Sequence, residues 1–213
     1  RQMCIRDRTY SLPWLVSKCS ETVQVKNDGR IFCTNERKKI QPQMSKKIIL
    51  ITGGQRSGKS SYAEKLALSL SDNPIYLATS RIWDDEHRKR IEHHQANRGP
   101  EWTNIEEEKY LSKVAVANRV VLIDCVTLWS TNFFFDNESD VKFSLEQIKS
   151  EFDKFILQDG YFIFVTNEIG LGGTSENKIQ RLFTDLQGWV NQYIAVKADE
   201  VYLMVSGIPM KVK

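Results

Sequence analysis

Hydrophobic positions along the chain follow two spacings, and together these predict an α/β fold. Five short apolar runs have the composition of strands buried on both faces: 47–52, 73–79, 120–124, 160–168 and 199–207. Apolar residues three and four positions apart predict amphipathic helices over three further stretches: 60–70, 144–158 and 175–198. A very polar helix with acidic residues near its start is expected at 83–97. Strands that alternate with helices predict a mostly parallel sheet flanked by helices.

The N-terminal segment lacks this order and has a different charge. Residues 1–47 carry 11 Lys and Arg against 4 Asp and Glu, whereas residues 48–213 carry 19 against 23. The net charge of +3 therefore belongs to the N-terminal segment, which argues against nucleic-acid binding by the rest. The segment has no secretory-signal pattern, although a transit peptide is an alternative. Met44 directly precedes the stretch "SKKIILITGG", a natural start for a domain that begins with a strand. We therefore expect 1–43 to be a disordered or non-native extension and 44–213 to be one folded domain.

Apolar run lengths and cysteine positions restrict the cellular setting. No run approaches ~18 consecutive apolar residues, so no membrane span is expected. Cys125 is the one cysteine after residue 47, and no cysteine spacing resembles a zinc site. A single cysteine cannot form a disulfide within the domain, so we expect a reduced, cytoplasmic protein.

The stretch "GGQRSGKS" follows the first predicted strand and opens the first predicted helix. It satisfies the phosphate-loop pattern Gly-x-x-x-x-Gly-Lys-Ser, in which backbone N–H groups and a helix N-terminus surround nucleotide phosphates. Lys59 is expected to reach the β- and γ-phosphates, and the Ser60 hydroxyl to bind Mg²⁺. The predicted phosphate contacts are Gly53, Gly54, Gln55, Arg56, Ser57, Gly58, Lys59 and Ser60. This motif predicts that 44–213 is a phosphate-loop NTPase-like, nucleotide-binding domain.

A phosphate loop that binds Mg²⁺ needs a carboxylate at the end of a neighbouring strand. The run "VVLID" ends in Asp124, which suits that role. Ser60 and Asp124 are therefore the predicted metal ligands.

His93 and His94 stand near the end of the predicted polar helix. From the residues alone two interpretations stay open: a solvated polar face, or a nucleophile whose neutral imidazole attacks phosphorus. Adjacent helix positions point about 100° apart, so the two histidines cannot share one task.

The main body resembles a known enzyme family from Lys47 to Lys213. The stretches that carry the resemblance are "ITGGQRSGKSSYAE", "YLATSRIWDDEHRKRIEHH", "IDCVTLWSTNFFF" and "VTNEIGLGGTSENKIQRLFTDLQGWVNQYIAVKADEVYLMVSGIPMKVK". They resemble the bifunctional adenosylcobinamide kinase / adenosylcobinamide-phosphate guanylyltransferase family of cobalamin synthesis. The resemblance implies phosphorylation of adenosylcobinamide with ATP or GTP. It also implies transfer of GMP from GTP to adenosylcobinamide phosphate through a histidine–GMP intermediate.

The resemblance also implies roles for individual residues. His93, the first histidine of the pair, would be the catalytic nucleophile. Lys59 would be the second catalytic residue. Ala78, Thr79 and Ser80 would form a second nucleotide-contacting segment. The guanine nucleotide would be held by Ala96, Asn97, Arg98, Gly99 and Glu106. A homo-oligomer, specifically a trimer, is implied as well. The chain departs from the family pattern at Gly99, where proline is usual, and at Thr174–Ser175, where a hydrophobic residue and proline are usual.

Two other functions fit the phosphate loop by itself. A single-activity small-molecule kinase is disfavoured by the segment Arg90-Ile-Glu-His-His94. A nucleotide-binding switch protein is disfavoured because the sequence has no Asn-Lys-x-Asp base-recognition motif. The sequence leaves the choice between ATP and GTP as phosphate donor open.

Overall fold

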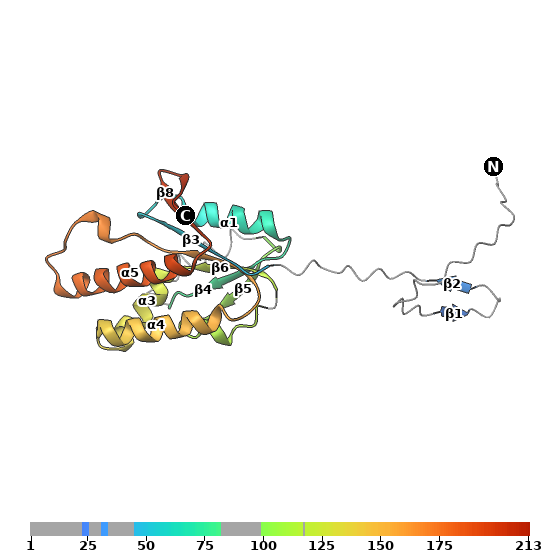
Figure 1. Ribbon diagram of the computed structural model, residues 1–213, viewed down its shortest axis with the longest axis horizontal. Coiled ribbons are helices and arrows are strands. Elements are labelled where there is room, and N and C mark those ends of the chain that lie inside the picture. The colour runs from blue at the N-terminus through green and yellow to red at the C-terminus, as the bar shows by residue number, and fades with distance from the viewer. Residues whose placement is uncertain (1–22, 26–30, 34–44, 82–98, 117) are drawn as a thin grey trace. The chain divides into compact units, whose positions relative to one another are not determined.

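The computed structural model describes residues 23–25, 31–33, 45–81, 99–116 and 118–213 (Figure 1). The chain divides into two units, Arg1–Gln41 and Pro42–Lys213. In the first unit, β1 (Val23–Val25) and β2 (Ile31–Cys33) pair in antiparallel fashion. All further elements belong to the second unit.

The second unit is built on a seven-stranded sheet with the order β5-β4-β6-β7-β3-β8-β9. Every neighbouring pair is parallel except β8 and β9, which form an antiparallel hairpin. The strands are β3 (Lys47–Gly53), β4 (Ile75–Ala78), β5 (Thr103–Glu106), β6 (Val120–Asp124), β7 (Tyr161–Val165), β8 (Glu200–Val205) and β9 (Ile208–Lys211). The predicted mostly parallel sheet is confirmed.

Helices cover both faces of this sheet (Figure 1). The described helices are α1 (Lys59–Leu70), α3 (Val126–Asp136), α4 (Val141–Phe155), α5 (Lys178–Lys197) and the 3₁₀ turns η1 (Leu111–Lys113) and η2 (Gly170–Gly172). Ile49 and Ile51 of β3 pack in the cluster that includes α1, whereas Leu50 packs in the cluster that includes α3, α4 and α5. Successive strand residues point to opposite faces. Burial on both faces therefore explains why the strands read as continuous apolar runs.

The sequence pattern located most elements of the second unit correctly. All five predicted strands and the three predicted amphipathic helices are present, with ends within three residues of those expected. The elements missed were the strands β5 and β9, the helix α3 and the short 3₁₀ turns η1 and η2. The predicted polar helix at 83–97 lies outside the described residues.

The missed elements share weak sequence signals. Helix α3 buries six of its residues, among them Trp129, Asn132 and Phe134, so its apolar positions form no single stripe. Strand β5 has four residues with partly exposed side chains, and all of β9 is exposed. In the part of the chain that the structure describes, no helix has the length and apolar character to cross a membrane.

Candidate functional site: a phosphate loop at the carboxyl edge of the sheet

The predicted phosphate loop joins β3 directly to α1. Gly58 is the N-cap of α1 and has φ 92° and ψ 11°, a left-handed conformation that glycine adopts without strain. Gly53 ends β3 with φ 154°, and a Cβ there would lie 2.7 Å from the Met204 carbonyl oxygen and 2.8 Å from Ser57 Oγ. Both glycines of the motif are thus required by the backbone itself.

Lys59 places its ammonium group inside this loop. The residue is 7% exposed, and Nζ donates hydrogen bonds to the Gly54 carbonyl oxygen at 2.6 Å and to Ser57 Oγ at 3.5 Å. Burial lowers the pKa of Lys59, although the nearby Cys125 and Asp124 favour the charged form. The cation is therefore held by loop carbonyl and hydroxyl oxygens at the point where phosphate charge would arrive.

Two segments distant in sequence support the loop. The Gly207 N–H, in the turn between β8 and β9, donates to the Ser57 carbonyl oxygen at 2.9 Å. The Glu168 N–H, just after β7, donates to the Gly53 carbonyl oxygen at 3.0 Å. No sequence motif pointed to either contact, because both depend on how β7 and β8 flank β3.

Four predicted site residues end parallel strands of the same sheet, in which β7 lies between β6 and β3. Gly53, Ala78, Glu106 and Asp124 are the last residues of β3, β4, β5 and β6. Ala78 is in register with both Glu106 and Asp124. Parallel strands place their carboxyl ends at one edge of a sheet, which is where α/β proteins bind ligands. The structure therefore brings these residues to the same edge as the phosphate loop.

Asp124 is oriented by a buried tyrosine. The Tyr76 hydroxyl donates to Asp124 Oδ2 at 2.6 Å, and Tyr76 is only 4% exposed. Among the described residues, none donates a hydrogen bond to Oδ1, the second carboxylate oxygen. Burial and the Asp124 charge raise the pKa of the adjacent Cys125 to about 12, so this thiol is not a nucleophile.

The predicted metal ligands fit Mg²⁺ in chemical type. Ser60 lies in the first turn of α1 and offers a hydroxyl, and Asp124 offers a carboxylate oxygen, which are the hard oxygen ligands that Mg²⁺ prefers. No group of three or more His, Cys, Asp or Glu side chains suited to a metal occurs among the described residues. Such a site would therefore take its remaining ligands from nucleotide phosphates and water.

The predicted nucleotide-contacting segment Ala78–Ser80 is fixed by backbone contacts. The Thr79 N–H donates to the Asp124 carbonyl oxygen at 3.3 Å, and Thr79 Oγ1 donates to the Cys125 carbonyl oxygen at 2.8 Å. Asn132 of α3 donates from Nδ2 to the carbonyl oxygens of Thr79 and Glu108, both at 2.9 Å. The segment is therefore tied to β6, to α3 and to the residues after β5.

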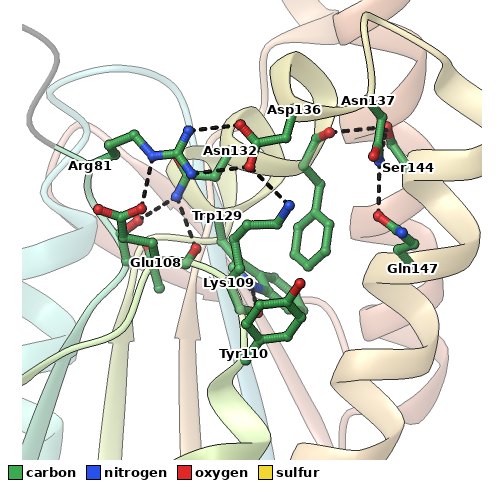
Figure 2. A network of polar contacts seen from close by, with 12 residues as sticks. Arg81, Glu108, Lys109, Tyr110, Trp129, Asn132, Asp136, Asn137, Ser144 and Gln147 are labelled. Atoms are coloured by element: carbon green, nitrogen blue, oxygen red, sulfur yellow. Dashed lines mark hydrogen bonds and ion pairs between the residues drawn. The ribbon is translucent and has the colours of Figure 1, made fainter.

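A charged network continues from this segment (Figure 2). Arg81 contacts Glu108 through Nε at 2.8 Å and Asp136 through both terminal nitrogens at 2.8 and 3.1 Å. Lys109 Nζ also contacts Asp136 at 2.9 Å, and Trp129 Nε1 donates to the Lys109 carbonyl oxygen at 2.9 Å. Two cations hold the pKa of Asp136 well below its usual range. The network joins the chain after β4, the chain after β5 and the end of α3, and sequence reasoning missed it.

The remaining predicted residues divide between described and undescribed parts. Gln55 and Arg56 are exposed at the tip of the loop, and Arg56 has φ 59°. His93, Ala96, Asn97 and Arg98 lie outside the described residues. Gly99 is the next described residue, and its carbonyl oxygen accepts a 3.3 Å hydrogen bond from the Trp102 N–H.

Comparisons with known proteins agree with these features. A family model described as cobinamide kinase / cobinamide phosphate guanyltransferase matches residues 49–212. The bifunctional adenosylcobalamin biosynthesis protein CobU of Escherichia coli (strain K12) is 40% identical over an alignment of 181 residues that covers 78% of this chain and 99% of that protein. For its namesake from Salmonella typhimurium, the identity is 39% over an alignment of 183 residues that covers 78% of this chain and 99% of that protein. For the protein CobP of Pseudomonas aeruginosa, the identity is 36% over an alignment of 169 residues that covers 77% of this chain and 96% of that protein.

Similar solved structures are more distant. A solved ATPase domain has a TM-score of 0.40 and 14% identity and covers 74% of this chain and 68% of that chain. The flagellar accessory protein FlaH from Methanocaldococcus jannaschii has a TM-score of 0.40 and 12% identity and covers 78% of each chain. We assign the α/β fold with its phosphate loop from the strand order of the sheet and from the geometry of the loop between β3 and α1.

Proposed function

The chain belongs to the cobinamide kinase / cobinamide phosphate guanyltransferase family, and on this premise we infer that it carries out both reactions of that family. Its first reaction phosphorylates cobinamide, and its second transfers a guanylyl group to cobinamide phosphate. The observation that carries the proposal is the Lys59 ammonium held inside a phosphate loop at the carboxyl edge of the sheet. We propose adenosylcobinamide as the acceptor and ATP or GTP as the donors.

In the kinase step, the protein positions the nucleotide and stabilises the charge on the transferred group. The substrate hydroxyl attacks the γ-phosphorus, its proton leaves, and the bond to the β-phosphate oxygen breaks. Lys59 and the N-terminus of α1 would face the phosphate oxygens. Ser60 and Asp124 would hold Mg²⁺, which neutralises phosphate charge when it is bound.

In the transfer step, we propose His93 as the nucleophile. Its imidazole nitrogen attacks the α-phosphorus of GTP, the bond to pyrophosphate breaks, and a phosphoramidate with GMP forms. A phosphate oxygen of cobinamide phosphate then attacks the same phosphorus, which releases the imidazole and gives a diphosphate-linked product. In each half of the reaction one bond to phosphorus forms and one breaks, so ping-pong kinetics are expected.

Anchoring of the residue that precedes the undescribed segment supports this assignment. Arg81 precedes residues 82–98 and is clamped by Glu108 and Asp136. Ala78 to Ser80, the proposed second nucleotide-contacting segment, and Glu106, a proposed guanine nucleotide contact, lie at the same edge of the sheet as Lys59. We also propose that the enzyme works in the cytoplasm as a homo-oligomer, specifically a trimer.

Labelling with GTP tests the proposal. The full chain is incubated with α-labelled GTP and Mg²⁺, and the protein-bound label is exposed to acid and to base. A label that acid removes and base leaves in place is expected, because phosphoramidates are acid-labile. A parallel reaction with γ-labelled ATP should transfer phosphate to cobinamide. Phosphorylation without protein labelling would identify a single-activity kinase, and the absence of both would overturn the proposal.

A further inference from the structure

A pocket beside the first half of α5 has no role in the reactions derived above. It has a volume of about 590 Å³ and lies between α5 and the glycine-rich loop that follows β7. The loop contributes Gly170, Gly173, Thr174 and Ser175. Figure 1 shows the segment between β7 and α5 as a long loop that leads away from the sheet and then turns back to the start of α5. We propose that this pocket binds the corrinoid macrocycle of the acceptor, an inference that rests on the proposed function.

The pocket is connected to the phosphate loop by a short stretch of chain. Glu168 donates its backbone N–H to the Gly53 carbonyl oxygen at 3.0 Å, so the loop after β7 begins at the phosphate loop. Two residues later, a Cβ on Gly170 would lie 3.9 Å from the Thr184 side chain of α5. The same loop therefore touches both the phosphate loop and the pocket. An acceptor held here can extend its hydroxyl-bearing arm along this stretch toward the γ-phosphate.

Gly188 is the most informative residue of the pocket. It lies near the middle of α5, a helix of 20 residues. Glycine in a helix interior lowers helix stability relative to alanine. A Cβ at Gly188 would meet no atom within 4 Å, and its φ is not positive, so neither packing nor backbone conformation requires glycine. A ligand that needs the space above the helix gives the glycine a physical reason.

The other side chains suit a large amide-bearing macrocycle. Trp189, next to Gly188, is 47% exposed and offers an aromatic surface, and Leu182 adds an apolar one. Asp185 and Gln192 line the same pocket, and their side chains make no hydrogen bond to another described residue. Their carboxylate and amide groups can bind the carboxamide groups at the rim of a corrinoid. Ligand pockets of this kind combine apolar surface with a few polar groups.

Arg181 holds the loop over the helix. It donates from one guanidinium nitrogen to the carbonyl oxygens of Ser175 and Glu176, at 2.9 and 2.7 Å. Asn177 caps α5 by accepting from the N–H groups of Ile179 and Gln180. The pocket wall is therefore an ordered part of the fold.

Blocking the pocket tests the proposal directly. Gly188→Phe places a ring in the open space, Gly188→Ala adds one methyl group to it, and Val196→Phe adds a comparable ring on α5 outside this pocket. Initial rates of cobinamide phosphorylation by γ-labelled ATP give the KM for each substrate. Protein labelling by α-labelled GTP, which needs no cobinamide, reports the nucleotide site, and sedimentation reports the oligomeric state.

We expect Gly188→Phe to raise the KM for cobinamide at least tenfold, while the KM for ATP and the GTP labelling stay within twofold of wild type. Gly188→Ala should raise the cobinamide KM by a smaller factor than Gly188→Phe, and Val196→Phe should stay within twofold throughout. Trp189→Ala and Asp185→Ala change exposed side chains and should also raise the KM for cobinamide. These two variants test the proposal even if Gly188→Phe fails to fold.

Three results are distinguishable from this expectation. A cobinamide KM within twofold of wild type in Gly188→Phe, Trp189→Ala and Asp185→Ala would overturn the corrinoid site and leave the proposed function standing. A change of oligomeric state in Gly188→Phe, with the cobinamide KM of Trp189→Ala and Asp185→Ala unchanged, would assign the pocket to a second copy of the chain instead. A wild-type chain that neither phosphorylates cobinamide nor takes label from GTP would overturn the proposed function itself.

Discussion

The Tyr76 hydroxyl donates a 2.6 Å hydrogen bond to Oδ2 of Asp124 across adjacent strands β4 and β6. Tyr76 is buried against Trp102, whose ring meets it edge-on with centroids 5.8 Å apart. Packing against Trp102 therefore holds the Tyr76 ring in place, and the Tyr76 hydroxyl orients the Asp124 carboxylate, the proposed Mg²⁺ ligand.

Tyr76→Phe removes this hydrogen bond and keeps the ring. Loss of a partner that orients a metal ligand is expected to lower kinase activity or Mg²⁺ affinity by about 10- to 100-fold. Kinase rates over a range of Mg²⁺ concentrations measure the effect. Tyr202→Phe is the matched control, because it removes a hydroxyl bonded to Glu200 outside the site. Equal Mg²⁺ dependence in wild type and Tyr76→Phe would contradict the assignment of Asp124.

Lys59→Ala should abolish the kinase step, because the transferred phosphate loses its main protein cation. Lys59→Met fills the same buried space without the charge and should fold as well as wild type, since burial opposes the ammonium. Phosphorylation of cobinamide measures activity, and thermal unfolding measures stability. Activity within twofold of wild type in either variant would rule out the proposed role of Lys59.

His93→Ala should eliminate protein labelling by α-labelled GTP and guanylyl transfer, and leave phosphorylation of cobinamide largely in place. The kinase step needs no enzyme nucleophile, whereas removal of the nucleophile forces direct transfer and costs several powers of ten in rate. His94→Ala is the matched control and should keep the label. Mass spectrometry of the trapped adduct locates the GMP. An adduct on His94 would contradict the assignment of His93 as the nucleophile.

Glu200 predicts a dependence of stability on pH. Its carboxylate accepts from Lys47 Nζ at 2.7 Å and from the Tyr202 hydroxyl at 2.8 Å, and these contacts lower the pKa of Glu200 from 4.5 to about 2. A carboxylate whose pKa falls on folding stabilises the fold above its unfolded pKa and loses that contribution as the pH drops through its folded pKa. The contribution at neutral pH is about 1–2 kcal/mol after allowance for partial solvent exposure.

Urea unfolding of wild type and Glu200→Gln between pH 7 and pH 2 tests this dependence. The difference in unfolding free energy should be fully present at pH 7, shrink from pH 4.5 downward and be nearly gone at pH 2. A difference that is independent of pH would show that the contact acts through packing and not through charge.

Deletion of residues 1–43 should leave fold and activity intact. The described strands of this region, β1 and β2, pair with each other in a unit separate from Pro42–Lys213. Thermal unfolding and both enzyme assays measure the effect. A fall in melting temperature of more than ~5 °C, about 1 kcal/mol or more for a domain of this size, would show that the segment stabilises the domain.

Features that depend on neighbouring residues could be predicted from the amino-acid sequence. Continuous apolar runs located the buried strands, and 3.6-residue periodicity located α4 and α5, because burial imposes those spacings directly. The phosphate loop was also readable, since Gly53 and Gly58 meet backbone requirements and Lys59 follows at a fixed distance. Asp124 was found as the last residue of an apolar run.

Contacts between groups that are distant in the sequence became visible in the folded structure. In the sequence, Tyr76 looks like an ordinary strand residue, and its contact with Asp124 depends on the pairing of β4 with β6. Asp136 looks like a surface acid in the sequence, and the position of α3 places it beside Arg81 and Lys109. Helix α3 escaped prediction because it is buried on several sides and has no polar face to set a period. In the sequence, Gly188 looks like an interruption of a helix, and the structure shows that it lines a pocket beside the loop after β7. Side-chain periodicity reports the burial of each element, whereas contacts between elements depend on strand order, which no local pattern encodes.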